Sequence, residues 1–147
     1  MILDFGGSEL VQFDGRALSF GNANGEDILV YPSVALMPRR DGQFALIDIR
    51  EISLDFRSVQ FVEEDAVPAD AKVVHETWAK VNKNGSPDLR FKGNYRIPVC
   101  LYGRLLFTSP GGLREEYQFS NIEAVENFSR AFDAYKITLP QLGVRVS

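Results

Sequence analysis

The chain has 147 residues, of which 45% are apolar and 24% are charged, so its size and composition are those of one globular domain. Its formal net charge is −4, which argues against a general nucleic-acid binder, because such a protein needs a surface that neutralises phosphates. Eleven Phe and five Tyr favour β-strands.

The single cysteine, Cys100, cannot form an intrachain disulfide, so a reducing compartment is the simplest interpretation. The first ten residues have neither the basic region nor the apolar run of a signal peptide. No stretch approaches the roughly 18 consecutive apolar residues that indicate a transmembrane helix. We therefore expect a cytoplasmic protein without a transmembrane segment.

The first third of the chain reads as short strands joined by turns. Residues 10–20 are typical of a hairpin, in which Asp14-Gly15 supplies the positive φ of a type I′ turn. Residues 27–38 form an apolar β-type run that contains Pro32, which predicts an edge strand or a break at that point. A further turn is predicted at Asp41-Gly42.

Residues 51–62 carry the best strand pattern in the chain. Ile52, Leu54 and Phe56 alternate with polar residues, which indicates one buried and one solvated face. The apolar phase then slips by one residue, to Val59 and Phe61. This slip predicts a β-bulge or a bend near Arg57-Ser58.

The segment 63–98 is predicted to be a long insertion. It opens with an acidic connector over 63–71, and residues 73–81 could form a strand. Residues 81–98 are rich in Asn, Gly, Ser and Pro, which indicates a long loop. Loops of that length in compact domains are often functional.

The C-terminal third predicts a hairpin that leads directly into a helix. A strand over 99–108 is followed by Ser109-Pro110-Gly111-Gly112, which fits a type II turn, and by a strand over 113–119. The helix is expected to begin at Ser120 or Asn121, and Ser120 with Glu123 matches a capping box.

The apolar residues of this helix recur at spacings of three and four, which predicts one buried stripe. They are Ile122, Val125, Phe128, Phe132 and Tyr135. Pro140 is expected to stop the helix early, leaving a short tail over 137–147. The whole pattern predicts a mainly β single domain, an antiparallel barrel or sandwich of seven to nine strands closed by one C-terminal α-helix.

Two stretches carry a resemblance to a known superfamily. GRLLFTSPGGLREEYQFSNIEAVENFSRAFDAY, residues 103–135, and FALIDIREISLDF, residues 44–56, resemble the pleckstrin-homology-like superfamily, including bacterial PH and GRAM-type domains. In that superfamily the last hairpin runs into a capping helix. The resemblance implies a PH-like fold used mostly for binding and scaffolding, and fold alone does not assign a function.

The sequence lacks the residues that most catalytic mechanisms require. His75 is the only histidine, so with one Cys the paired spacings of metal ligands cannot occur. Cys100 lies in an apolar run, which favours a buried, inert thiol. We expect no catalytic residue, no metal site and no cofactor, and keep as an alternative an acid/base pair formed by Asp48 and Asp55.

The segment 78–96 stands out by its charge. It holds five cations and one carboxylate, a net charge of +4, so the remaining residues carry −8. Aromatic residues interleave with these cations, a combination that can anchor a protein partner or bind phosphates. The candidate partner-binding residues are Trp78, Lys80, Lys83, Arg90, Phe91, Lys92, Tyr95 and Arg96. The alternative is that the segment folds onto the acidic residues 63–70 of the same chain.

Three functions remain open. The first is a small intracellular, non-catalytic binding or adaptor module that contacts a protein through the segment 78–96 or through an exposed sheet edge, with anionic lipid and nucleic acid as less favoured ligands. The second is an oligomeric assembly protein, such as a phage-related or complex subunit, or an acidic immunity-type protein. The third is an enzyme that uses only carboxylates, drawn from Asp48, Glu51, Asp55 and Glu64.

Overall fold

The computed structural model describes residues 3–6, 16–22 and 25–141. The elements in this part of the chain are β1 (Leu3–Gly6), β2 (Ala17–Phe20), β3 (Ile28–Val30), β4 (Val34–Pro38), β5 (Phe44–Asp48), the short 3-10 helix η1 (Ile49–Glu51), β6 (Ser53–Val62), β7 (Lys72–Trp78), β8 (Arg96–Thr108), β9 (Arg114–Phe119) and α1 (Ile122–Gln141). The turn predicted at Asp14-Gly15 lies outside the described residues.

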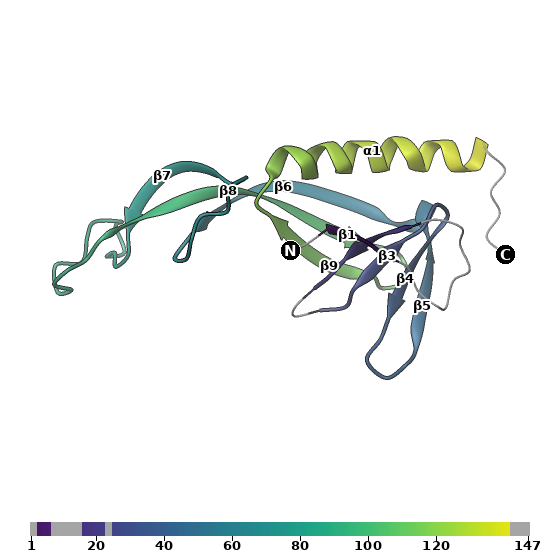
Figure 1. The fold of residues 1–147 in the computed structure, drawn as a ribbon, viewed down its shortest axis with the longest axis horizontal. Coiled ribbons are helices and arrows are strands. Elements are labelled where there is room, and N and C mark those ends of the chain that lie inside the picture. The colour runs from purple at the N-terminus through teal and green to yellow at the C-terminus, as the bar shows by residue number, and fades with distance from the viewer. Residues whose placement is uncertain (1–2, 7–15, 23–24, 142–147) are drawn as a thin grey trace.

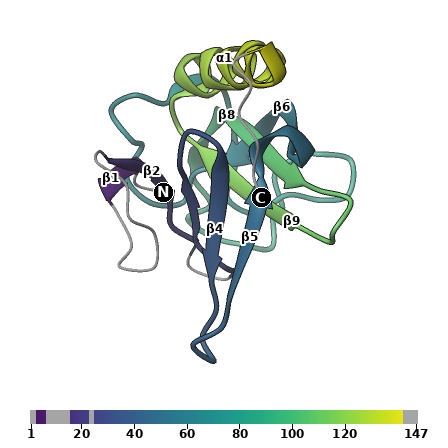
Figure 2. The same ribbon diagram turned by 90° about the vertical axis from the view of Figure 1, so that its right-hand side faces the viewer.

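The fold is mainly β, with one C-terminal α-helix, as predicted. Strands β1 to β5 form an antiparallel sheet in chain order. In the second sheet β8 is central: β6 pairs with one edge of it, and β7 and β9 pair with successive parts of the other edge. The described residues thus form two separate sheets and not a closed barrel (Figures 1 and 2).

The crossing between the sheets follows the sequence pattern. Pro32 interrupts the predicted run, and the Tyr31 amide donates to the Val34 carbonyl (2.9 Å) across the turn between β3 and β4. After β5 the chain makes one turn of 3-10 helix, which Asp48 caps by accepting from the Arg50 amide. Ile49 and Ile52 are fully buried on either side of this turn, which fixes the chain where it leaves the first sheet for the second.

The bulge predicted near Arg57-Ser58 is wrong. β6 pairs with β8 without a register shift, from Ser53 opposite Thr108 to Val62 opposite Val99. The apolar phase slips because the strand passes from one environment to another. Leu54 and Phe56 pack against the core of the body, whereas Phe61 lies on the opposite face and stacks on Tyr102, with ring centroids 5.3 Å apart.

The hairpin turn between β8 and β9 also differs from its prediction. The positive φ falls at Gly112 (+105°), one residue later than a type II turn would place it. The Gly112 amide donates to the Ser109 carbonyl (3.1 Å), and the Ser109 amide donates to the Leu113 carbonyl (3.1 Å). This is a type I turn followed by a glycine bulge, a common three-residue hairpin loop.

The capping box predicted for α1 is wrong, because Asn121 caps the helix. Its side-chain oxygen accepts from the Ala124 amide (3.1 Å), while the Ser120 hydroxyl donates to Asp70 (2.6 Å). The helix also continues through Pro140 to Gln141, further than predicted. Buried Leu139 and the bond from the Lys136 ammonium to the Ile52 carbonyl hold its last turns against the body, which outweighs the missing proline amide. Residues 142–147 lie outside the described part.

The helix lies along one side of both sheets and closes the core between them (Figures 1 and 2). Gly103 on β8 permits this contact, since a Cβ there would lie 3.3 Å from the Cβ of Val125. The Tyr135 hydroxyl donates to the Pro32 carbonyl and so ties the helix to the first sheet. The fully or nearly buried core residues include Phe20, Ile28, Ala35, Ile49, Ile52, Leu105, Phe107, Tyr117, Val125, Phe132 and Leu139.

Candidate functional site

A long arm projects from this body (Figure 1). It consists of β7, the tip loop over residues 79–95, and the first residues of β8, so we define the arm as residues 72–101. β7 pairs with residues 96–101 of β8, with a register shift at Val74, and beyond Val99 the arm has no β6 partner. The strand considered for residues 73–81 is β7, and the long loop predicted over 81–98 is observed over 79–95, because β8 already begins at Arg96.

The base of the arm is fixed to the body by buried polar contacts. The Tyr102 hydroxyl donates to the Glu63 carboxylate (2.5 Å), and the Glu63 amide donates to the Pro98 carbonyl (3.0 Å). Burial, together with the bond to Glu63, raises the pKa of Tyr102 above its ordinary value. The Asp70–Ser120 bond joins the end of the connector to the start of α1.

The tip loop is ordered by its own hydrogen bonds. Val81 and Pro87 form an isolated β-bridge around a tight turn, and the Asn94 side-chain amide both accepts from and donates to the Lys80 backbone (3.0 and 2.8 Å). Asp88, only 5% exposed, accepts from the Arg90 amide and guanidinium, at 2.7 Å for the shortest contact. The guanidinium holds the pKa of Asp88 below its ordinary value, so this ion pair persists at neutral pH.

This ordered loop displays apolar side chains to solvent. Leu89 is 89% exposed and Tyr95 is 61% exposed, and Val81 and Phe91 are about half exposed. The paired strands of the arm, which are β7 and residues 96–101 of β8, form its shaft. Val73 and Val74 on β7 are also exposed. A single exposed leucine is common on protein surfaces, whereas these residues form a group of exposed apolar side chains on one projecting, ordered segment.

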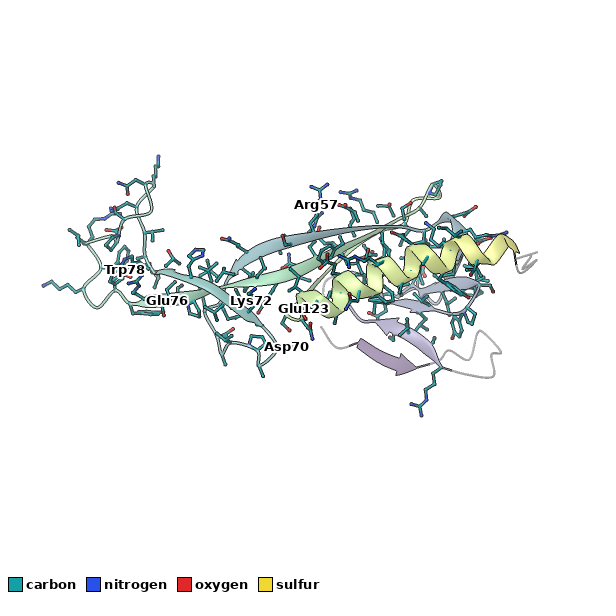
Figure 3. The ribbon with its side chains drawn as sticks, turned by 90° about the horizontal axis from the view of Figure 1, so that it is seen from above. Arg57, Asp70, Lys72, Glu76, Trp78 and Glu123 are labelled. Atoms are coloured by element: carbon teal, nitrogen blue, oxygen red, sulfur yellow. The ribbon has the colours of Figure 1, made fainter. Side chains whose placement is uncertain are left out.

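The predicted partner-binding residues all lie on the arm, in two places. Trp78 and Arg96 face each other on the shaft, where the guanidinium lies 5.7 Å from the indole and 3.5 Å from Glu76; Figure 3 shows Trp78 and Glu76 along the arm. The other six belong to the tip loop: Lys80, Lys83, Arg90, Phe91, Lys92 and Tyr95. All eight are exposed except Trp78, which is half-buried.

The cations of the arm make local contacts. Arg90 pairs with Asp88, Arg96 pairs with Glu76, and Lys80 lies 5.8 Å from the ring of Phe91. Among the described residues no ion pair joins the segment 78–96 to the acidic residues 63–70. The alternative in which the basic segment folds onto its own acidic connector is therefore not the arrangement observed.

The carboxylates considered for catalysis are dispersed. Asp48 pairs with Arg50 (2.6 Å) and Asp55 with Arg57 (2.9 Å), each with the arginine two residues further along the chain. The Arg50 guanidinium holds the pKa of Asp48 below its ordinary value, which is the opposite of what a general acid needs. His75 is exposed on β7, and Cys100 is fully buried, as predicted. No group of three potential metal ligands occurs in the described part of the chain.

A pocket of about 240 Å³ lies where the arm meets the body, and sequence reasoning missed it. We call it the base pocket. Its lining is mainly apolar, from Phe20, Phe119, Ala124, Val125 and Phe128, with Asp70 at its edge. Asp70 is bonded to Ser120, which precedes α1, and Glu123 lies in the first turn of that helix; Figure 3 labels both carboxylates. The pocket unites β2, β9, α1 and the connector, which are distant in the chain and carry no shared motif.

No protein-family model, curated protein or solved structure matches this chain. Among the described helices, none has the length and apolar character needed to cross a membrane.

Proposed function

We propose that this protein is a non-catalytic binding module that contacts a protein partner through the tip loop of its arm. The observation that carries the proposal is the group of exposed apolar side chains on the ordered tip loop, where Leu89 is 89% exposed, Tyr95 is 61% exposed, and Val81 and Phe91 are about half exposed. Water-exposed apolar side chains gain free energy when a partner covers them, by roughly 25 cal/mol for each Å² that is buried.

The order of the tip loop also supports binding. Its turns use positive φ at Gly85 (+82°) and Gly93 (+78°), and the ion pair between buried Asp88 and exposed Arg90 fixes the residues around Leu89. A loop that is ordered before binding loses less conformational entropy on association. Aromatic and arginine side chains, which dominate the energetics of many interfaces, surround the leucine in this loop as Arg90, Phe91 and Tyr95.

The element order supports a PH-like body that carries this arm as an insertion. Strands β6, β8 and β9 run as a meander into α1, and the five-stranded sheet precedes them. The core residues shared by the two sheets favour a sandwich in which the helix closes one side. In this interpretation the body is the PH-like scaffold, and β7 with the tip loop is an insertion that carries the binding surface.

The test is a pull-down from cells of the source organism with the tagged full-length chain, read by mass spectrometry. We expect Leu89→Asp to lose a protein that the unchanged chain captures. The matched control is Leu46→Asp on β5, where the leucine is 55% exposed on the body. Loss of the protein with both variants, or with neither, would contradict the proposal. Arg90 is a poorer choice for substitution, because it orders the loop through Asp88.

A further inference from the structure

The two ends of the arm differ in charge. The segment 78–96 has a net charge of +4, and the other residues have −8. The connector over 63–71, at the base of the arm, has four carboxylates and no cation. One of these carboxylates, Asp70, lines the base pocket and is bonded to Ser120, and Glu123 follows in the first turn of α1 (Figure 3).

The base pocket has the size of a side-chain acceptor. An apolar cavity of about 150 Å³ accommodates a benzene ring, and typical small-molecule sites measure about 300–1,000 Å³. The base pocket, at about 240 Å³, lies between the two and is lined by three phenylalanines. It therefore fits one large apolar side chain better than it fits a cofactor-sized ligand.

Charge selects this pocket over other depressions on the body. A second depression between α1 and the first sheet has Arg16 in its lining, and a third, near the β8–β9 turn, has both Arg39 and Glu51. Both would place a cation opposite the basic tip loop. The base pocket combines an apolar lining with the carboxylate of Asp70, which is complementary to an exposed leucine in a segment of net positive charge.

The tip loop cannot reach the base pocket of its own chain. Gly103 lies against Val125, which lines the pocket. It is seven residues along β8 from Arg96, the residue at which the chain leaves the tip loop. A strand rises about 3.3 Å per residue, so the tip loop begins about 23 Å away. β8 is paired along this whole length and cannot fold back.

These observations point to a second copy of this chain as the partner, an inference that rests on the binding role proposed for the tip loop. The geometry points to Leu89 of one copy entering the base pocket of the next, with Arg90 and Lys92 near Asp70 and Glu123. Because the two contacting surfaces differ, the contact is head-to-tail and can repeat, giving a ring if the rotation closes and a filament if it does not.

The experiment measures the mass of the purified full-length chain by sedimentation velocity over a range of micromolar concentrations. We expect the unchanged chain to form species larger than a monomer, with association weakened by added salt. Leu89→Asp removes the inserted side chain, and Ala124→Arg fills the pocket and adds a cation. Each should weaken association by about ten-fold or more, as the loss of a central contact does.

Matched control variants separate the loss of this contact from an unspecific loss of folding or solubility. Leu46→Asp makes the same change at an exposed leucine of the body, and Ala134→Arg makes the same change at an exposed position of the same helix. Both should associate like the unchanged chain. Circular dichroism of every variant establishes that it is folded.

Mixing the two defective variants tests the head-to-tail geometry. Leu89→Asp retains an intact pocket and Ala124→Arg retains an intact tip, so each mixed pair has one functional contact. We expect the mixture to form a dimer and no larger species, whereas each variant alone stays monomeric. A mixture that also stays monomeric would overturn the pairing of tip with pocket.

Two other outcomes overturn the inference and leave the proposed function standing. In the first, the unchanged chain is monomeric at all concentrations while Leu89→Asp still loses a different protein in the pull-down, which would make that protein the partner. In the second, the monomer floats with vesicles of anionic phospholipid in a Leu89-dependent way, which would assign the tip to a membrane surface. If Leu89→Asp changes neither association nor capture, the proposed function itself fails.

Discussion

Truncation of Phe132 to alanine tests how α1 is held against the sheets. Phe132 is 5% exposed and packs in the core beside Phe128, with ring centroids 6.1 Å apart. Removal of a buried phenylalanine side chain costs about 3–5 kcal/mol, from lost transfer free energy and from the cavity that remains. The higher helix propensity of alanine returns about 0.5 kcal/mol, so we expect a net loss of about 3–4 kcal/mol.

The assay is urea denaturation followed by circular dichroism. A domain typically has a free energy of unfolding of about 5–15 kcal/mol, so the variant should fold and its midpoint should fall sharply. Ile137→Ala is the matched control, because Ile137 is 68% exposed on the same helix and its loss should cost no more than about 0.5 kcal/mol. A loss below about 1 kcal/mol for Phe132→Ala would mean that the helix does not close the core.

Three further predictions follow from single contacts. Asn121→Ala should lower the free energy of unfolding by about 1 kcal/mol in the same assay, and an unchanged free energy of unfolding would contradict Asn121 as the cap. Burial raises the pKa of Tyr102 and of Tyr117 above 10.0, so their neutral phenols stabilise the fold fully below about pH 10, and that contribution is lost as the pH rises through the folded-state values. Absorbance titration should show two late-ionising tyrosines that disappear in the corresponding phenylalanine variants; ordinary ionisation of both would refute this. Asp88→Ala should speed amide exchange at Arg90 and Phe91 while body amides keep their protection, and unchanged exchange in the tip would show that the ion pair does not order it.

Local patterns of the sequence predicted the elements well. Pro32 marked the break between β3 and β4, the alternation of Leu54 and Phe56 marked the face of β6 that packs on the core, and the three-and-four spacing of Val125, Phe128 and Phe132 marked the helix face. These signals depend on backbone limits and on periodicity, which residues close in the chain determine.

Predictions that required tertiary context were wrong. From the sequence alone, the phase slip at Val59 looks like a bulge. The structure shows instead that β6 stays in register with β8 and that its apolar side chains change from one face of the strand to the other. Ser120 and Asn121 are both good caps, and the Asp70 carboxylate decides between them. Pro140 is tolerated because distant residues hold the last turns of α1.

The candidate site was predicted in part. The charge and aromatic content of residues 78–96 identified the segment, and all eight residues named from the sequence lie on the arm. Leu89, the most exposed large apolar residue of the described chain, was missed because one leucine between two charged residues has no periodic signal. The base pocket was missed because its residues come from four separate parts of the chain.

The most direct test of the tip loop as a binding surface is photo-crosslinking from position 89. A chain with a photoreactive amino acid in place of Leu89 is irradiated both alone and in an extract of the source organism, beside a chain with the same group in place of Leu46. We expect position 89, and not position 46, to give a defined protein adduct, and with the purified chain alone we expect that adduct to map to the base pocket of a second copy. Absence of any adduct specific to position 89 in both samples would contradict a binding role for the arm.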